Sequence, residues 1–451
     1  MAAASVDDRP LTAEGLAQHL AEGCKPNGPF LIGAEHEKFV FHTAGHTTVP
    51  YEPEGIKALL EGLMPFGWQG VYEDETLIAL SRGKASVSLE PAGQFELSGA
   101  PLESIHDICQ ETGRHLQEVK AVADPLGVGF LGLGFAPTWR REDCPIMPKA
   151  RYGIMRAYMP KVGGKGLDMM LRTCTVQANL DFASEADMIK KFRVSLALQP
   201  LATALFANSP FVEGKPSGLL SSRANVWTDT DPDRTGMLDF VFQDGFSFQT
   251  YADYALDVPM YFVRREGRYI DTAGRSFRAF MKGELPELPG ERPTLGDWSD
   301  HLTTLFPEVR LKQYLEMRGA DSGPATRICA LPALWAGILY DDQALDAAAA
   351  LCRDWTAEER GTLRNNAARL GLKGEIAGRP VQHVARDMVA IAKAGLRRRA
   401  KLNASLLDET CFLSELEEIA DSGVTPAERL LELYHGPWQG DAGRAFDDLA
   451  Y

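Results

Sequence analysis

The chain has 451 residues, of which 45% are hydrophobic and 24% charged. These proportions are typical of an ordinary soluble globular protein with a sizeable core, arranged as one large domain or two. The formal net charge is −15, from 47 basic and 62 acidic residues. This balance argues against a general nucleic-acid-binding or anionic-membrane surface, because phosphate backbones require excess positive charge, although local basic pockets remain allowed.

No run of about 18 apolar residues is present, and the first ten residues, MAAASVDDRP, lack the composition of a signal or transit peptide. We therefore expect a cytoplasmic protein with no membrane segment, in which residues 1–10 form a disordered tail. The seven cysteines are dispersed and form no CxxC motif, so neither a zinc site nor a secreted disulfide framework is indicated. Most should be buried thiols.

A surface helix is expected over Thr12–Cys24, followed by a strand over Leu31–Phe41, LIGAEHEKFVF. Alternation along that strand places Glu35 and Glu37 on one face, ~7 Å apart, where they could hold separate hard cations or one hydrated cation. His36 lies on the opposite face and is expected to be a packed residue. The E-x-E pattern is common on strands, so it is weak evidence by itself.

The stretch Ser86–Leu102, SVSLEPAGQFELSGAPL, holds two further glutamates in strand-like sequence. The segment Pro91–Gly93 interrupts the alternation, which resumes at Gln94, so Glu90 and Glu96 can face one place. The alternative is a pair of solvated carboxylates on an edge strand. We interpret the stretch as one wall of an active site.

A helix is expected over Leu102–Val122, and the glycine-rich GVGFLGLGFAP after it begins with G-x-G-x-x-G, from Gly127 to Gly132. A helix precedes this motif and no helix follows it, which excludes a dinucleotide-binding loop and favours a buried strand. The basic segment Trp139–Gly166 is expected to be irregular and to contact anions. It lacks the pattern of a phosphate-binding P-loop.

The clearest strand in the sequence is Thr173–Phe182, TCTVQANLDF, whose polar face carries amides rather than lysine or glutamate. Gln177 and Asn179 on that face suit contacts with a ligand or metal-bound water as well as with solvent. Ser184 is a candidate N-cap for a helix that continues to Phe206.

Further along the chain, the acidic run near Trp227–Arg234 is expected to be a solvated loop, and Phe248–Val263 to contain a strand. Val309–Arg318, VRLKQYLEMR, alternates again and puts Glu316 and Arg318 on one strand face. A carboxylate beside a guanidinium can bind a cation and an anion side by side, as a metal–nucleotide site requires. The alternative is a solvated mixture of charges.

Helices are expected after Ala330, over Ala333–Arg353, Ala357–Arg369, Val381–Ala400, Leu407–Ala420 and Pro426–Tyr434. No linker sets this region apart. We therefore expect residues 11–451 to form a single catalytic domain in which 340–435 is a mostly helical layer.

Five carboxylates stand on separated strands: Glu35, Glu37, Glu90, Glu96 and Glu316. If they converged they would repel one another strongly without counter-charge, and divalent cations would supply it. Hard oxygen ligands without paired histidine or cysteine favour Mg²⁺ or Mn²⁺. Mg²⁺ beside basic residues points to phosphoryl transfer from ATP.

Several segments closely resemble plant-type glutamate–cysteine ligase, a family that also occurs in proteobacteria. They are GAEHEKFVF, LEPAGQFELSGAPLE, GLDMMLRTCTVQANLDF, ALQPLATALFANSPF, WTDTDPDRTGML and YLEMRGAD. The likeness runs from about residue 11 to Tyr451, and we expect a proteobacterial member. It implies an α+β, glutamine-synthetase-like fold, in which an antiparallel sheet forms a funnel with helices around it.

The resemblance implies ATP-dependent joining of the γ-carboxylate of glutamate to the amine of cysteine through a γ-glutamyl phosphate, the first step of glutathione synthesis. By likeness to glutamine synthetase, Glu37, Glu90 and Glu96 would hold one Mg²⁺, and Glu35 with Glu316 would hold cations on the nucleotide phosphates. Gln177 and Asn179 match further polar ligands. Arg318 would stabilise the transferring phosphoryl group, Arg151 and Arg223 would contact substrate carboxylate or phosphate, and Tyr261 would line the cysteine pocket.

Cys109 and Cys329 align with a regulatory cysteine pair of the plant enzymes, and the resemblance makes them a candidate redox pair. Thr272 and Glu287 stand where the plant pattern has a second pair, and Asp239 replaces a proline. We therefore expect a monomer or weak homodimer with no redox-controlled dimerisation. Two alternatives stay open: a ligase that uses another small amine, and a nucleotide-binding regulator without catalysis.

Overall fold

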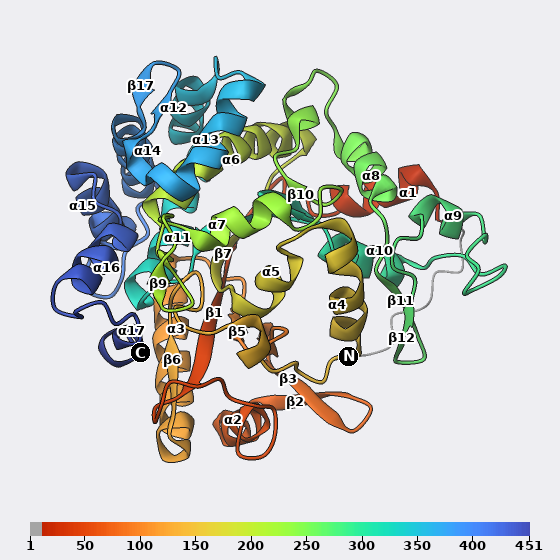
Figure 1. Ribbon diagram of the computed structural model, residues 1–451. Coiled ribbons are helices and arrows are strands. Elements are labelled where there is room, and N and C mark those ends of the chain that lie inside the picture. Colours follow the sequence, from red (N-terminus) through yellow and green to blue (C-terminus); the bar gives the residue numbers. More distant parts are fainter. Residues whose placement is uncertain (1–10) are drawn as a thin grey trace.

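The computed structural model describes residues 11–451, so the disordered tail expected at residues 1–10 lies outside the described residues (Figure 1). Its centre is an antiparallel sheet of nine strands. In sheet order the path is β14 (Val309–Leu311), β15 (Leu315–Asp321), β7 (Thr175–Leu180), β1 (Ile32–His42), β5 (Phe95–Ser98), β4 (Ala85–Leu89), β3 (Thr76–Arg82) and β2 (Gln69–Glu73). Off this path, β6 (Val128–Leu131) pairs with the C-terminal part of β1.

Four small two-stranded ladders lie outside this sheet: β8 (Phe211–Val212) with β9 (Lys215–Pro216), β10 (Thr235–Gly236) with β13 (Phe306–Pro307), β11 (Phe262–Arg265) with β12 (Arg268–Asp271), and β16 (Glu375–Ile376) with β17 (Arg379–Pro380). The helices of the first half are α1 (Ala13–Ala21), α2 (Ile56–Leu63), α3 (Ile105–Ala123), α4 (Ala150–Val162), α5 (Gly166–Arg172), α6 (Glu185–Leu205), α7 (Ser222–Val226) and α8 (Phe248–Asp257). Those of the second half are α9 (Phe277–Met281), α10 (Leu295–Thr303), α11 (Ala325–Leu339), α12 (Asp342–Cys352), α13 (Ala357–Leu370), α14 (Val381–Arg399), α15 (Ser414–Ser422), α16 (Pro426–His435) and α17 (Arg444–Asp448).

Alternation along the central strands gives the sheet one apolar face and one polar face. On β7, Val176, Ala178 and Leu180 are fully buried in a core that also contains α6 and α11. The intervening Gln177 and Asn179 therefore point to the opposite face. The expected α+β class, an antiparallel sheet surrounded by helices, is confirmed.

The long helix α6 shows how local sequence signals fix an element. Ser184 lies in extended conformation and its side chain accepts a hydrogen bond from the backbone N–H of Asp187, as the sequence predicted for an N-cap. The C-terminal part of α6 is buried almost all round, and Thr203 donates to the carbonyl of Gly319 on β15 at 3.0 Å. α6 is thereby attached directly to a central strand.

Two segments that were expected to form strands have a different secondary structure over part of their length. Phe248–Val263 begins as helix α8, whose buried residues Phe248, Tyr251, Ala252, Ala255 and Leu256 follow a helical period that the sequence interpretation missed. Only the last two residues of the range, Phe262 and Val263, belong to a strand, β11. Val309–Arg318 is a hairpin of β14 and β15 rather than one strand. Its two halves preserve the alternation, so the apolar and polar faces were assigned correctly despite the turn.

Three other expectations also need correction. The basic segment Trp139–Gly166 is not irregular throughout, because it contains α4, and the expected helix Ala333–Arg353 is two helices that meet near Tyr340. The acidic run is not a solvated loop: Asp231 and Arg234 are fully buried and form an ion pair at 2.6 Å. Among the free cysteines of residues 11–451, only Cys174 is fully buried.

No helix within residues 11–451 combines the length and apolar character needed to cross a membrane. Helices α12 to α17 gather on one side of the molecule, coloured cyan to blue in Figure 1, and α11 links them to the sheet because it packs on both β7 and α14.

The contact between α11 and α14 depends on two glycines. A Cβ atom at Gly395 would lie 1.8 Å from the carbonyl oxygen of Gly337, and one at Gly337 would lie 2.3 Å from the carbonyl oxygen of Ala392. The obstructing atoms are backbone, which cannot rotate away. The two helices can approach this closely only because both positions lack side chains.

We expect Gly395→Ala to lower the free energy of unfolding by about 1–3 kcal/mol, because the added methyl group must push two packed helices apart. Gly361→Ala in α13 is the matched control, since a Cβ there meets no atom within 4 Å. The control should be neutral or slightly stabilising. Urea denaturation of both variants checks this, and equal stabilities would contradict the account of the contact.

Candidate active site

The polar face of the sheet carries most of the residues singled out in the sequence. Directly opposite one another on neighbouring strands lie Glu37 and Glu96, Glu35 and Gln177, and Asn179 and Glu316. Residues opposite each other on antiparallel strands project from the same face of the sheet. Four strands therefore contribute to one row of carboxylates and amides.

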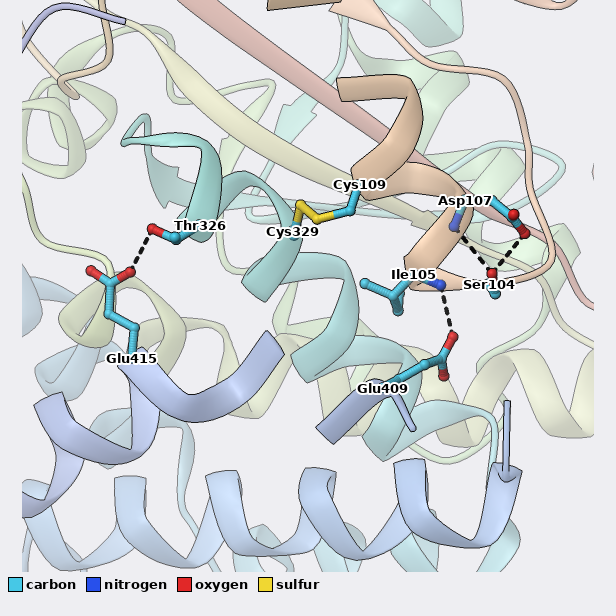
Figure 2. Close-up of a disulfide and its surroundings, with 8 residues drawn as sticks. All are labelled: Ser104, Ile105, Asp107, Cys109, Thr326, Cys329, Glu409 and Glu415. Carbon is cyan, nitrogen blue, oxygen red and sulfur yellow. Dashed lines mark hydrogen bonds between the residues drawn. A yellow bond between two sulfur atoms is a disulfide. The ribbon is translucent and has the colours of Figure 1, made fainter. Parts of the chain in front are cut away.

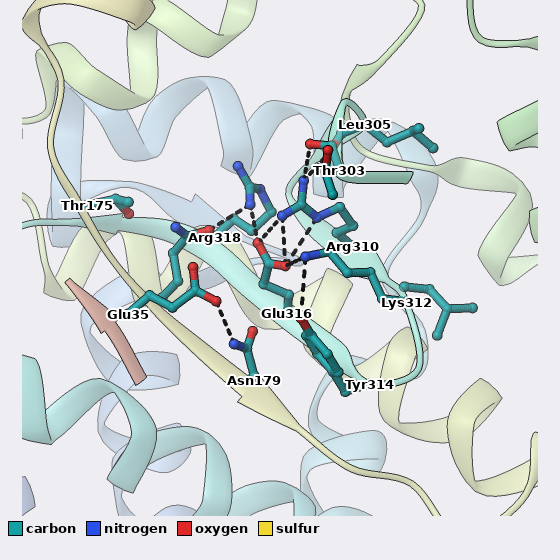
Figure 3. A network of polar contacts seen from close by, with 12 residues as sticks. Glu35, Thr175, Asn179, Thr303, Leu305, Arg310, Lys312, Tyr314, Glu316 and Arg318 are labelled. Carbon is teal, nitrogen blue, oxygen red and sulfur yellow. Dashed lines mark hydrogen bonds and ion pairs between the residues drawn. The ribbon is translucent and has the colours of Figure 1, made fainter. Parts of the chain in front are cut away.

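Glu316 is fully buried among three cations (Figure 3). Arg310, its opposite neighbour on β14, donates to both carboxylate oxygens, at 2.7 Å from Nη2 to Oε1 and at 3.1 Å from Nε to Oε2. Lys312 Nζ lies 3.2 Å from Oε2, and Arg318 donates to Oε1. Burial opposes ionisation, but these three charges outweigh it and lower the pKa of Glu316 well below its usual range.

Arg318 connects this cluster to the amide row. Its Nη1 also donates to Gln177 Oε1 at 2.6 Å, and its backbone N–H donates to the carbonyl of Glu308. The residue lies where the pairing of β15 with β7 shifts register, between Met317 and Ala320. The guanidinium is held through Nη1 by both Gln177 and Glu316, and it lines the principal pocket of the site.

The other carboxylates of the row lack such counter-charge. Burial first, and then the charges of Glu316 and Glu96, raise the pKa of Glu35 to about 7, although Asn179 donates to it at 2.6 Å. Burial and the charges of Glu90 and Glu96 raise the pKa of Glu37 well above its usual value. Burial and Glu90 likewise raise the pKa of Glu96. The mutual repulsion expected from the sequence is therefore present.

As the side chains stand, no group of three or more acidic, histidine or cysteine residues within 11–451 has the spacing of a metal site. The chemistry of the donors nevertheless fits a hard divalent cation. Glu37, Glu90 and Glu96 offer oxygen only, and the charges of Glu90 and Glu96 disfavour the ionised form of Glu37, which a cation between them would reverse.

The principal pocket lies over Glu37 and Arg318. It combines these charged groups with Glu90, Arg151 and Arg223, and its apolar lining is Tyr152, Met155, Met169, Met170, Trp227, Phe262 and Phe306. Arg223 donates through Nη2 to the carbonyl of Arg318 at 2.9 Å. Its remaining nitrogens and the Nε of Arg151 are buried without an acceptor among the described residues. The pocket is thus suited to an anionic substrate group.

A second cavity, of about 420 Å³, lies along the same row of carboxylates and amides on the sheet. Glu35 and Asn179 line it together with Lys84 and Tyr314. The row of polar side chains therefore connects two cavities, with Glu37 on one and Glu35 on the other. Such an arrangement can hold two different substrates on either side of Glu316 and Arg318.

Tyr261 does not line either cavity. It is 99% buried, its ring lies under the guanidinium of Arg234 at 3.9 Å, and its hydroxyl contacts Met159 Sδ at 3.5 Å. The next residue, Phe262, lines the principal pocket instead.

Three basic residues of the site, Arg310, Lys312 and Lys149, were missing from the sequence-based set of candidates. Arg310 was visible on the alternating stretch, but its pairing with Glu316 needed the hairpin turn to be recognised. Lys149 lies in the basic segment that was expected to contact anions, and it donates to the carbonyl of Leu89 at 2.8 Å. Burial and the neighbouring Arg151 lower its pKa to about 8.

Cys109 on α3 and Cys329 on α11 form a disulfide, with their Cα atoms 5.7 Å apart (Figure 2). α11 begins four residues after β15, so the disulfide ties α3 to the segment that follows Arg318. Both helices also bond to the C-terminal region: Ile105 N–H donates to Glu409, and Thr326 donates to Glu415.

The sequence profile of glutamate–cysteine ligase family 2 matches residues 31–448. The chain is 58% identical to the chloroplastic glutamate–cysteine ligases of Arabidopsis thaliana and Nicotiana tabacum over 449 residues, which is 99% of this chain and 84% of each relative. Identity to ligase B of Oryza sativa subsp. japonica is 56% over 443 residues, 98% of this chain and 88% of that one.

Among solved structures, a glutamate–cysteine ligase from Francisella tularensis in complex with AMP aligns with a TM-score of 0.53 at 14% identity, covering 94% of this chain and 89% of that one. At this identity the alignment shows a common fold and no more.

The comparisons correct one expectation and leave another without support. The relatives are chloroplastic by name, which contradicts the cytoplasmic location inferred from the composition of ten N-terminal residues. They are plant proteins, so they do not support a proteobacterial origin. The profile match covers most of the chain and the identities exceed one half over nearly its whole length, so the chain belongs to glutamate–cysteine ligase family 2.

Proposed function

We propose that the protein uses ATP to join the γ-carboxylate of glutamate to the amine of cysteine, the first step of glutathione synthesis. The observation that carries this proposal is the row of buried carboxylates and amides that ends at Glu316 and Arg318, between two cavities. Family membership supplies the substrates, because the relatives are named for this reaction. Residues 11–451 would act as one catalytic domain.

The chemistry requires activation of a carboxylate, which is a poor electrophile. An oxygen of the glutamate γ-carboxylate attacks the γ-phosphorus of ATP, the bond from that phosphorus to the ADP oxygen breaks, and γ-glutamyl phosphate forms. The cysteine amine then attacks the acyl carbon, inorganic phosphate leaves, and the amine loses a proton. Both steps collect negative charge on phosphoryl oxygens, where preorganised cations are most effective.

The residues of the row would bind different groups during this reaction. Glu37, Glu90 and Glu96 would hold one Mg²⁺, or Mn²⁺, and Glu35 with Glu316 would hold cations on the nucleotide side, with Gln177 and Asn179 as further polar contacts. Bound Mg²⁺ would neutralise phosphate charge and orient the phosphates. In the structure Glu316 is shared by Arg310, Lys312 and Arg318, so a cation at Glu316 requires one of these ion pairs to open.

Arg318 is the group we assign to the transferring phosphoryl group, because it is fixed by Glu316 and Gln177 and lines the pocket. Arg151 and Arg223 would bind the glutamate α-carboxylate or a phosphate, which is consistent with their buried nitrogens lacking acceptors among the described residues. Tyr261 would contribute to the cysteine subsite only indirectly, through the position of Phe262.

We also propose that the Cys109–Cys329 disulfide modulates activity by tethering α3 to the helix that follows the Arg318 strand. Thr272 and Glu287 occupy the positions of a second cysteine pair. The protein would therefore be a monomer or weak homodimer, and its oligomeric state would not change on reduction.

The proposed reaction is tested by measuring ADP release with Mg²⁺ and ATP while glutamate and a panel of small amines are varied, with the products identified by mass spectrometry. ADP release should require glutamate and be fastest with cysteine as acceptor. Equal ADP formation without glutamate would overturn the ligase assignment, and a better acceptor than cysteine would change the substrate.

Arg318→Ala should lower kcat on the order of 10²–10³-fold while changing the KM for glutamate little, because the charge acts where the phosphoryl group transfers. Arg318→Lys should recover part of the loss. Arg369→Ala, at an exposed position of α13, is the control for removal of an arginine. Thermal melts of all three variants establish folding, and wild-type turnover in Arg318→Ala would refute the role.

The raised pKa of Glu35, about 7, predicts how Mg²⁺ stabilisation depends on pH. In the metal-free protein the folded state keeps a proton that the unfolded chain has lost, so stability decreases as the pH rises through about 7. A cation favours the ionised carboxylate. Mg²⁺ should therefore raise Tm more at pH 8 than at pH 6, and Glu35→Gln should reduce this difference; equal Tm shifts in the wild type at both pH values would contradict it.

Reduction of the disulfide should lower the free energy of unfolding by up to about 5 kcal/mol, because the bond closes a loop of 220 residues in the unfolded chain. Urea denaturation with and without dithiothreitol measures this, and the Cys109→Ser/Cys329→Ser variant should not respond to reductant. Light scattering should show the same mass in both states, and a reductant-dependent mass would rule out the proposed oligomeric behaviour.

A further inference from the structure

A cleft remote from the catalytic row has the composition of a binding site. It lies between α6, the short segment around Phe242, and the junction of α12 with α13, and has a volume of about 660 Å³. This size falls within the range of small-molecule sites in proteins, roughly 300–1,000 Å³. It shares no residue with the two cavities of the candidate active site.

The charge of the cleft is opposite to that of the protein. No described residue that lines it is acidic, and four are cationic: Lys190, Arg193, Arg353 and Arg360. Two acidic neighbours lie outside the lining, where Asp346 pairs with Lys190 and Asp239 lies 3.7 Å from Arg360. In a chain with a formal net charge of −15, such a concentration of positive charge favours an anionic ligand.

The cationic groups are held in different ways. Arg193 donates to the carbonyls of Val241 and Gln243, which fixes one wall of the cleft. Arg360 is 93% buried; one nitrogen donates to the carbonyl of Trp355, and its Nε is buried without an acceptor among the described residues. Arg353 is exposed and forms no side-chain hydrogen bond or ion pair with residues 11–451.

Aromatic surface lies next to these charges. Trp355, which is 7% exposed, lines the cleft from the junction of α12 with α13, and Phe242 lines it from the short segment Asp239–Phe242, with the Arg360 guanidinium 3.6 Å from the centre of its ring. Ile189 and Val194 of α6 add aliphatic lining. An anion alone would leave this apolar surface unused, whereas a flat or apolar body attached to the anion would cover it.

We propose that this cleft is a binding site for an organic anion whose phosphate or carboxylate group contacts Arg353 and Arg360 and whose planar apolar body packs against Trp355 and Phe242. The proposal does not rest on the ligase reaction, because the cleft and the candidate active site have no residue in common.

The test is isothermal titration calorimetry of the full chain with naphthyl phosphate, which combines both chemistries, in the presence of Mg²⁺ and a saturating non-hydrolysable ATP analogue. We expect binding that persists with the nucleotide present. Arg353→Ala should weaken it about tenfold, as expected for loss of one charged hydrogen-bonding partner. Arg369→Ala, which removes an exposed arginine from the last turn of α13, should leave it unchanged.

Two partial ligands distinguish the parts of the site. Inorganic phosphate and the neutral naphthylmethanol should each bind more weakly than naphthyl phosphate. Absence of binding to the wild type, loss of binding when the nucleotide is added, or equal effects of the two arginine substitutions would overturn the proposal. So would naphthylmethanol or inorganic phosphate binding as tightly as naphthyl phosphate.

Discussion

The structure of the site depends on how buried carboxylates on one sheet face are balanced by positive charge. A single ionised carboxylate in a protein interior is costly, and several close together are more so unless cations accompany them. Glu316 is balanced within the protein by Arg310, Lys312 and Arg318, which keep it ionised. Glu35, Glu37 and Glu96 have no comparable partners, and their raised pKa values show the cost. Glu316 is thus balanced by the protein itself, whereas the other three carboxylates are suited to balance by added divalent cations.

The two-faced sheet makes this arrangement possible. Alternate residues of β7 are buried against α6 and α11, and the stability of that apolar core keeps the opposite face rigid. The register of four antiparallel strands then places residues that are up to 281 positions apart in sequence, Glu35 and Glu316, within electrostatic reach. The C-terminal end of β15 is fixed as well, because Asp321 accepts hydrogen bonds from Ser209 and Ser221. Positive charges held in place in this way can stabilise the charge that develops during phosphoryl transfer.

Much of the fold and of the charged row could be predicted because the signals are local. Alternation alone assigned Glu35 and Glu37 to one face of β1, and the N-cap residue Ser184 indicated where α6 begins. The turn between β14 and β15 was missed because the alternation continues through it, so the pairing of Arg310 with Glu316 was not foreseen.

Other misses concern partners that are distant in sequence. Asp231 looked like a solvent-exposed residue, yet Arg234 neutralises it in the interior and stacks on Tyr261, which removes that tyrosine from the pocket wall. The helical period of α8 was present in the sequence and was overlooked. Residue roles came mainly from likeness to a family, because a spacing of carboxylates does not specify which substrate they serve.

The central claim is that a phosphoryl group passes to the γ-carboxylate of glutamate beside Arg318. The most direct measurement uses glutamate labelled with ¹⁸O in the γ-carboxylate, together with ATP, Mg²⁺ and cysteine, followed by mass spectrometry of the inorganic phosphate. If γ-glutamyl phosphate forms, one labelled oxygen leaves with the phosphate for each peptide bond made. Phosphate without ¹⁸O, released alongside γ-glutamylcysteine, would contradict the account.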